Sequence, residues 1–130
     1  MNKLVSIITP SYNSSQFIEE CASSVFSQTY QHWEMIIVDD YSSDNSREII
    51  SELALKDDRV KTIFLSENLG AAQARNIAIN KSKGKFIAFL DSDDLWCPEK
   101  LEKQISFMKE NKVDFSFTTY QLISEDGKKL

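Results

Sequence analysis

Apolar and polar positions alternate along the chain in two kinds of run. Short runs dominated by apolar residues are typical of strands that are buried on both faces of a sheet. Between them, apolar residues recur every three or four positions, as on the buried stripe of an amphipathic helix. The strand-like runs cover residues 4–9, 35–38, 60–65, 86–90 and 114–123, and the helix-like stretches cover residues 17–26, 45–54, 71–78 and 98–108. This alternation predicts an α/β fold of three layers, α/β/α, with a mainly parallel sheet and right-handed crossovers.

The ends of these elements carry local signals. We expect Pro10 to end the first strand, and Asp44 or Asn45 to cap the second helix. Residues 125–128 form a turn signal with nothing after it to pair with. With 130 residues, three glycines and two prolines, we expect one domain over residues 1–130. Because the chain stops just after a turn, we also expect it to be the front part of a longer protein, truncated at its C-terminus.

The acidic composition restricts the classes of partner. Twenty acidic residues against fifteen basic ones give a formal net charge of −5, which disfavours sequence-independent binding to nucleic acid. Cys21 and Cys97 lack the spacing of a metal or redox motif, so we expect two reduced thiols. No apolar run approaches the length of a membrane span, and no signal-peptide pattern follows the first residues. We therefore expect a cytoplasmic location.

Polar side chains collect at one edge of the predicted sheet. In an open parallel sheet, ligands bind beyond the carboxyl ends of the strands. The acidic residues that follow the second and fourth strands are Asp39, Asp40, Asp91, Asp93 and Asp94. Such charges repel one another unless a cation offsets them, and Mg²⁺ or Mn²⁺ takes carboxylate and phosphate oxygens together. The pattern indicates a metal that bridges the protein to a phosphorylated ligand, although each acidic pair alone would also suit a solvated helix cap.

Three other side chains have both a functional and a purely structural interpretation. Tyr12 could stack on a nucleobase, because every base offers a π-face, or could pack on the surface. Arg75 could grip phosphate or orient a carboxylate, or could form a surface ion pair of little consequence. His32 is expected to be a loop residue, and no serine or cysteine nucleophile set can be built around it.

Several short motifs follow one another across nearly the whole chain. They are Val5–Asn13, Ser27–Tyr30, Trp33–Glu34, Ile36–Ser42, Asn68–Gly70, Ala74–Asn76, Phe89–Asp94 and Pro98–Leu101. In this order they resemble the N-terminal, nucleotide-sugar-binding part of the family 2 glycosyltransferases, which have the GT-A fold. Each motif is short, but the ordered set is highly specific.

The resemblance implies a donor site at the four strand ends. Its nucleotide-sugar-binding residues would be Thr9, Pro10, Tyr12, Asn13, Asp39, Asp40, Asn68, Gly70, Arg75, Asp91 and Ser92. Tyr12 would lie near the base, Asp40 at the base edge, and Arg75 near the nucleotide or its diphosphate. Asp91-Ser92-Asp93 matches the family's DXD motif, in which Asp93 would hold Mn²⁺ or Mg²⁺. Asp91 would approach the ribose or a water on the metal.

The resemblance also implies a reaction. A hexosyltransferase of this type moves a sugar from a nucleotide-diphosphate donor, most often a UDP-sugar, to an acceptor hydroxyl with inversion. The acceptor would be a saccharide or a lipid-linked sugar in surface polysaccharide or glycolipid biosynthesis, which is compatible with the inner face of the membrane. The general base is expected beyond Leu130. We therefore expect this chain to bind nucleotide and metal without a complete active site, the acceptor-binding part being absent.

Two other classes compete with this interpretation. Asp39 and Asp40, with Asp91 further along, resemble the acidic pocket of a response-regulator receiver domain. A receiver places its acidic pair after the first strand, however, and needs a late lysine for which the chain is too short. A haloacid-dehalogenase-type phosphatase fits less well, because Asp94-Leu95 replaces its usual continuation. A catalytically silent nucleotide-binding module stays open.

Overall fold

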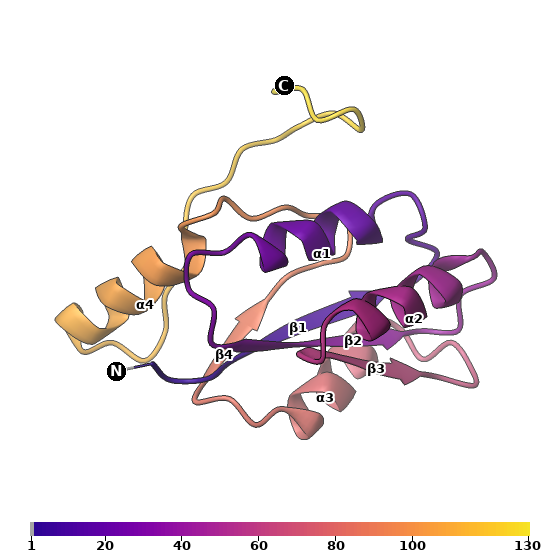
Figure 1. Cartoon of the computed structure of the whole chain (residues 1–130), viewed down its shortest axis with the longest axis horizontal. Helices are drawn as coiled ribbons and strands as arrows, with labels where there is room; N and C mark the ends of the chain where they lie inside the picture. The colour runs from indigo at the N-terminus through magenta and orange to yellow at the C-terminus, as the bar shows by residue number, and fades with distance from the viewer. Residues whose placement is uncertain (1) are drawn as a thin grey trace.

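A four-stranded parallel sheet forms the centre of the computed structural model, which describes residues 2–130 (Figure 1). The strand order is β3-β2-β1-β4, and each strand is followed by a helix. The strands are β1 (Val5–Ser11), β2 (Trp33–Asp39), β3 (Val60–Phe64) and β4 (Phe86–Phe89). The helices are α1 (Ile18–Phe26), α2 (Ser46–Lys56), α3 (Ala71–Lys81) and α4 (Lys100–Asn111).

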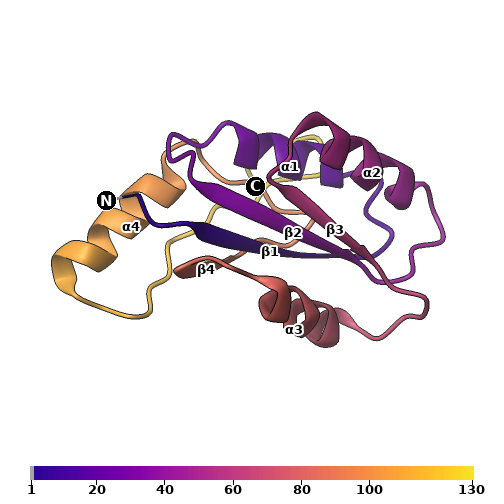
Figure 2. The ribbon, with the colours of Figure 1, turned by 60° about the horizontal axis from the view of Figure 1, so that its bottom comes forward.

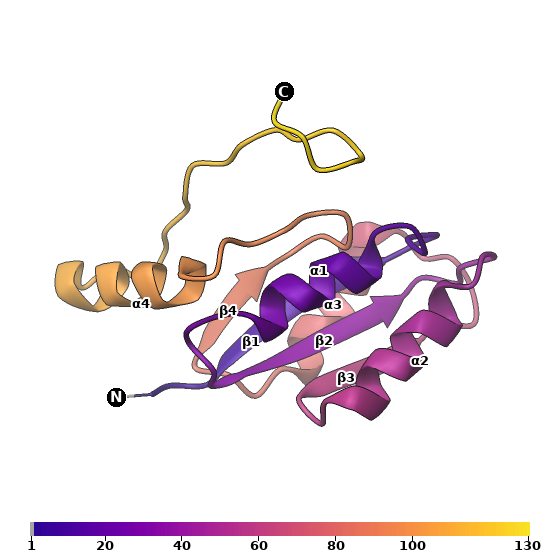
Figure 3. The same cartoon turned by 45° about the horizontal axis from the view of Figure 1, so that its top comes forward.

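The helices cover both faces of the sheet, which confirms the predicted three-layer architecture. Figure 2 shows α1 and α2 on one face and α3 on the other. α4 lies beside the sheet and contributes Leu101 and Ile105 to the core under α1 (Figure 3). No helix within residues 2–130 is long and apolar enough to cross a membrane.

The alternation of side chains along the strands divides the buried residues into two cores. Ile7, Met35 and Ile37 face α1 and α2. Ile8 and Ile36 face α3 and pack with its small residues in the other core. Because both faces are covered, the strands are continuous apolar runs. The same alternation sends neighbouring residues at a strand end to opposite sides of the sheet.

The prediction that Pro10 ends the first strand is wrong, because β1 continues through Ser11. Ser11 O accepts the Asp40 amide from the β2 side, so Pro10 faces the β4 side of β1. The pairing of β4 with β1 stops at Ile8 and Phe89. The amide that proline lacks is therefore not needed for a strand contact at this position.

The prediction of a fifth strand over residues 114–123 is also wrong. This segment has no strand assignment, and it leads away from the sheet towards the C-terminus in Figure 1. Phe115, Phe117 and Tyr120 are each at least 80% exposed, so the apolar pattern is present but no described strand pairs with it. The turn after it closes a small hairpin, in which Leu130 N donates to Leu122 O (3.1 Å).

Gly84 lies where the chain approaches β1 most closely. A Cβ there would stand 2.6 Å from both Ser6 N and Ser6 Oγ and 2.9 Å from Leu4 O. We expect Gly84→Ala to lower the free energy of unfolding by about 2 kcal/mol, because the backbone must move to admit the methyl group. Gly127→Ala is the comparison: no atom lies within 4 Å of its Cβ position, and its φ of 85° alone makes alanine cost about 1 kcal/mol. Urea denaturation measures both, and equal losses would argue against the close approach at Gly84.

Candidate functional site

A cavity of about 530 Å³ opens at the carboxyl ends of β1, β2 and β4. It brings together most of the residues predicted for the site, namely Pro10, Tyr12, Asn13, Asp40, Asn68, Gly70, Arg75, Asp91, Ser92 and Asp93. Thr9 and Asp39 do not line it. Both are fully buried and, by strand alternation, lie on the face of the sheet that α1 and α2 cover.

Four further residues line the same cavity; one of them, Ser11, falls within the Val5–Asn13 motif, and the motifs did not single out the other three. They are Ser11, Ser14, Phe17 and Ala71. Ser14 and Phe17 share the loop that carries Tyr12, and this shared loop is the signal that could have found them. Ser11 differs from them, because its hydroxyl is buried without a hydrogen-bond partner among residues 2–130.

A second cavity, of about 570 Å³, lies at the opposite end of the strands. Its lining residues are Asn2, Thr29, Tyr30, Gln31, His32 and Glu102. Glu102 is its one carboxylate, and Glu102 Oε2 accepts a hydrogen bond from Thr29 Oγ1 (2.9 Å). Because ligands of open parallel sheets bind at the carboxyl edge, the first cavity is the better candidate for the functional site.

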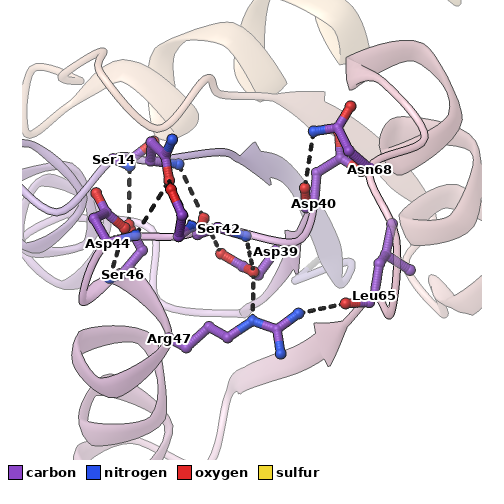
Figure 4. A network of polar contacts seen from close by, with 11 residues as sticks. Ser14, Asp39, Asp40, Ser42, Asp44, Ser46, Arg47, Leu65 and Asn68 are labelled. Atoms are coloured by element: carbon purple, nitrogen blue, oxygen red, sulfur yellow. Dashed lines mark hydrogen bonds and ion pairs between the residues drawn. The ribbon is translucent and has the colours of Figure 1, made fainter.

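The two acidic residues after β2 have different surroundings (Figure 4). Asp39 is fully buried, and its Oδ2 accepts hydrogen bonds from Arg47 Nε (2.9 Å) and Ser42 N (3.0 Å). Its Oδ1 accepts a hydrogen bond from Ser42 Oγ (2.5 Å). The Arg47 guanidinium also donates to Leu65 O and lies over the Tyr41 ring, 5.7 Å from its centroid. Asp39 therefore anchors the loop after β2 from beneath.

Asp40 points to the other side, towards the start of α3. Its Oδ1 accepts the Leu69 amide (2.7 Å) and its Oδ2 accepts the Gly70 amide (2.9 Å). Asn68 Nδ2 donates to Asp40 O (3.0 Å). The carboxylate is thus held at the N-terminus of a helix, where amide groups favour negative charge. A carboxylate has about four acceptor positions, so Asp40 retains some that can face a ligand.

The loop that carries Tyr12 is attached to the loop after β2. Asn13 N donates to Ser42 Oγ (2.9 Å), and Asn13 Oδ1 accepts the Ser43 amide (2.8 Å). Asn13 has a φ of 49°, a left-handed conformation that asparagine tolerates. Tyr12 is half exposed beside these contacts and faces the cavity. Its ring is therefore available as a stacking surface on a fixed backbone.

The acidic loop after β4 lines the same cavity as Tyr12. Arg75 Nη2 lies 2.9 Å from Asp91 Oδ1, so the structure shows Arg75 orienting a carboxylate. Asp93 is exposed, and no side chain within residues 2–130 pairs with its carboxylate. Burial raises the pKa of Asp94, and the charges of Asp93 and Asp91 raise it further. Like charges therefore gather in this loop without full compensation.

The five acidic residues do not surround a single point, which corrects the expected cluster. Asp39 is paired with Arg47, and Asp40 is held by amides. Within residues 2–130, no group of three or more His, Cys, Asp or Glu side chains is placed to hold a metal alone. Mg²⁺ and Mn²⁺ at phosphate sites need only one or two carboxylates, with phosphate and water completing the shell. The free Asp93 carboxylate and the second oxygen of Asp91 fit such an ion.

Cys21 lies beneath the acidic loop and supports it. Its thiol donates to Asp91 O at 3.5 Å. Burial raises the pKa of this thiol to about 12, and the charges of Asp94, Asp93 and Asp91 act in the same direction. The thiol therefore stays protonated at neutral pH and is not a nucleophile. Cys21 and Cys97 are both free, as expected.

The family model described as glycosyl transferase family 2 matches residues 6–129. TuaG of Bacillus subtilis, a glycosyltransferase named for teichuronic acid biosynthesis, is 52% identical over 124 residues, which cover 95% of this chain and 49% of TuaG. WfgD of Escherichia coli, named as a UDP-Glc:α-D-GlcNAc-diphosphoundecaprenol β-1,3-glucosyltransferase, is 47% identical over 95% of this chain and 48% of its own length. The chain thus spans about half the length of these relatives.

Solved structures show the same arrangement of elements. TarS of S. aureus, residues 1–349 in complex with UDP, aligns with a TM-score of 0.77 and 28% identity over 90% of this chain and 38% of that one. The mannosyltransferase PcManGT of Pyrobaculum calidifontis, in complex with GDP-Man and Mn²⁺, aligns with a TM-score of 0.77 and 25% identity. That match covers 83% of this chain and 33% of PcManGT.

Proposed function

The chain belongs to glycosyl transferase family 2 and has the GT-A fold, and from this membership we propose that its cavity binds a nucleotide-diphosphate sugar together with a divalent metal ion. The observation that carries the proposal is the position of Asp93. Its unpaired carboxylate shares the cavity with the exposed Tyr12 ring. A donor with a base at one end and a diphosphate at the other suits a cavity that holds both a stacking surface and a metal-binding carboxylate.

The residues at the nucleotide end of the cavity have distinct roles in this proposal. Tyr12 stacks on the base, and Asp40 accepts a hydrogen bond from the base edge through an acceptor position that Leu69 and Gly70 leave free. Asn68, held against Asp40 O, and Gly70 border the base, while Pro10 and Asn13 shape the nucleotide end of the cavity. Thr9 and Asp39 lie outside the cavity, so we assign them to its support.

The acidic loop and Arg75 would act at the diphosphate. Asp93 would hold Mn²⁺ or Mg²⁺, with Asp91 near the ribose or the metal's water shell. When bound, such an ion offsets the charge of the diphosphate leaving group. Arg75 keeps Asp91 oriented through one Nη and has further N–H groups that can face a phosphate oxygen. These contacts bind the donor and leave its sugar open to attack.

The transfer itself needs a second part. We propose an inverting transfer of a hexosyl group, with UDP-sugar as donor and a general base on the acceptor side, outside residues 1–130. The two named relatives, twice as long as this chain, are named for teichuronic acid and for a diphosphoundecaprenol acceptor. They support a cell-surface polysaccharide or glycolipid as the product. We further propose a cytoplasmic enzyme at the inner face of the membrane. A catalytically silent binding module would keep the same site, whereas family membership excludes a receiver domain.

The location of the site can be tested by amide chemical shifts of the ¹⁵N-labelled chain during titration with UDP and Mg²⁺. We expect the largest shifts at Tyr12, Asn13, Gly70 and Ser92, because these residues line the cavity. Titration with GDP, run in parallel, would identify the preferred base. Shifts confined to Gln31 and His32, in the opposite cavity, or no shifts with either nucleotide, would contradict the proposal.

A further inference from the structure

Two serine hydroxyls join loops that are far apart in the sequence. Ser14, in the loop after β1, and Ser92, in the loop after β4, have their Oγ atoms 2.6 Å apart. The two residues are only 6% and 8% exposed. Both line the cavity. The contact therefore lies between the loop that carries Tyr12 and the loop that carries Asp93.

The other contacts of Ser14 fix its position in the loop after β1. Ser14 Oγ donates to Tyr12 O (3.3 Å). Either hydroxyl can donate across the 2.6 Å contact, and when the Ser14 proton points to Tyr12 O, Ser92 Oγ–H donates to Ser14 Oγ. Ser14 N donates to Ser46 Oγ (2.9 Å), which ties the same residue to the start of α2 (Figure 4). Ser14 is thus held through both its backbone and its side chain, and its hydroxyl is hydrogen-bonded to the hydroxyl of Ser92 in the acidic loop.

The acidic loop needs such support. Asp91, Asp93 and Asp94 carry like charges within four residues, and their repulsion favours spreading of the loop. Arg75 compensates Asp91 alone. The Ser92 hydroxyl bonds to Ser14, which lies outside the acidic loop, and so holds the middle of that loop. Ser92 directly precedes Asp93 in the chain. Loss of this contact would let the Asp93 carboxylate leave the position that faces the cavity.

We infer that Ser14 is a positioning residue for metal-dependent donor binding: the hydroxyl bridge from Tyr12 through Ser14 to Ser92 holds Asp93 where a divalent cation and a nucleotide diphosphate meet. The inference rests on the proposed function, because it assigns a task to the metal and donor named there. It adds that the base-stacking residue and the metal-holding residue are coupled through two buried hydroxyls. Ordering of one loop then favours binding at the other.

The test is calorimetric titration of UDP into the 130-residue chain, in Mn²⁺ and in EDTA, for Ser14→Ala, Ser92→Ala and the double variant. We expect each single variant to weaken UDP binding about tenfold in Mn²⁺ and less than about twofold in EDTA. The double variant should lose no more than either single one, because all three break the same bridge. Ser92→Thr keeps the hydroxyl and should restore most of the affinity.

Ser24→Ala is the matched control. Ser24 Oγ donates to Cys21 O (2.7 Å) and accepts the Trp96 amide (3.2 Å), so it joins α1 to the same segment without lining the cavity. It should lower thermal stability and leave UDP affinity in Mn²⁺ unchanged. If Ser14→Ala and Ser92→Ala bind UDP as the wild type does, or lose the same factor in UDP affinity in Mn²⁺ and in EDTA, the inference is overturned and the proposed function stands. Wild-type binding that is indifferent to Mn²⁺ would overturn both.

Discussion

Asp93→Ala is expected to weaken the binding of UDP in Mn²⁺ about a hundredfold, equivalent to ~2.7 kcal/mol. Asp93 is the one carboxylate of the acidic loop that is exposed in the cavity without a partner among residues 2–130. Asp91 is already engaged by Arg75. Removal of Asp93 takes away the anionic ligand that a hard cation requires, so the contribution of the cation to diphosphate binding is lost.

The control for this variant is Asp58→Ala. Asp58 is also exposed, but it lies in the turn between α2 and β3 and lines neither described cavity. It changes the net charge by the same amount, so it separates a local effect at the metal site from a general electrostatic one. Calorimetry in Mn²⁺ and in EDTA gives both affinities. An Asp93→Ala chain that still binds UDP more tightly in Mn²⁺, by the wild-type factor, would show that Asp93 does not hold the metal.

Arg47→Met is expected to lower the free energy of unfolding by about 3 kcal/mol. The substitution leaves the fully buried Asp39 carboxylate without its cation, and an uncompensated buried charge costs roughly 3–5 kcal/mol. We expect the low end of this range because the Arg47 side chain is 37% exposed and water partly screens the ion pair. The loops after β1 and β2 are also expected to loosen, since Asp39 holds Ser42 and Ser42 receives the Asn13 amide.

Arg59→Met provides the matched control for Arg47→Met. Arg59 also pairs with an aspartate, Asp57, and also lies over an aromatic ring, that of Trp33 (3.7 Å). Asp57 is partly exposed, so water can solvate it when the arginine is removed. We expect a loss of about 1 kcal/mol. Adding Asp39→Asn to Arg47→Met should recover part of the larger loss, because it removes the buried charge. A variant Arg47→Met as stable as Arg59→Met would contradict this account of Asp39.

The strands and the edge that carries the site could be predicted because burial on both faces leaves a clear trace in the sequence. The runs at residues 35–38 and 86–90 are apolar because α1 and α2 cover one face and α3 the other. Parallel strands then bring their carboxyl ends to one edge. Tyr12, Asp40 and Asp93 follow strands of this sheet and line one cavity, and Arg75, which the family resemblance implied, lines it too.

The sequence was less informative where the structure depends on the direction of a side chain or on a contact with a distant segment of the chain. In the sequence, Asp39 and Asp40 look like one acidic pair, but strand alternation points the Asp39 side chain towards α2 and the Asp40 side chain towards α3. Residues 114–123 have the composition of a strand, but pairing depends on a neighbour that no local pattern specifies. Ser14 resembled any loop serine, and its contact with Ser92 spans 78 positions. Such a contact leaves no periodic signal in the sequence.

The most direct test of the central claim is titration of UDP into the wild-type chain in the presence of Mn²⁺ and again in EDTA. If the cavity at the carboxyl edge is a metal-dependent nucleotide-diphosphate site, UDP binds about a hundredfold more tightly with Mn²⁺ than without it, which is the factor expected to be lost in Asp93→Ala. GDP, titrated in the same two media, covers the other nucleotide seen in a similar structure. The account would be contradicted if the nucleotide that binds does so with equal affinity with and without the metal. It would also be contradicted if neither UDP nor GDP binds.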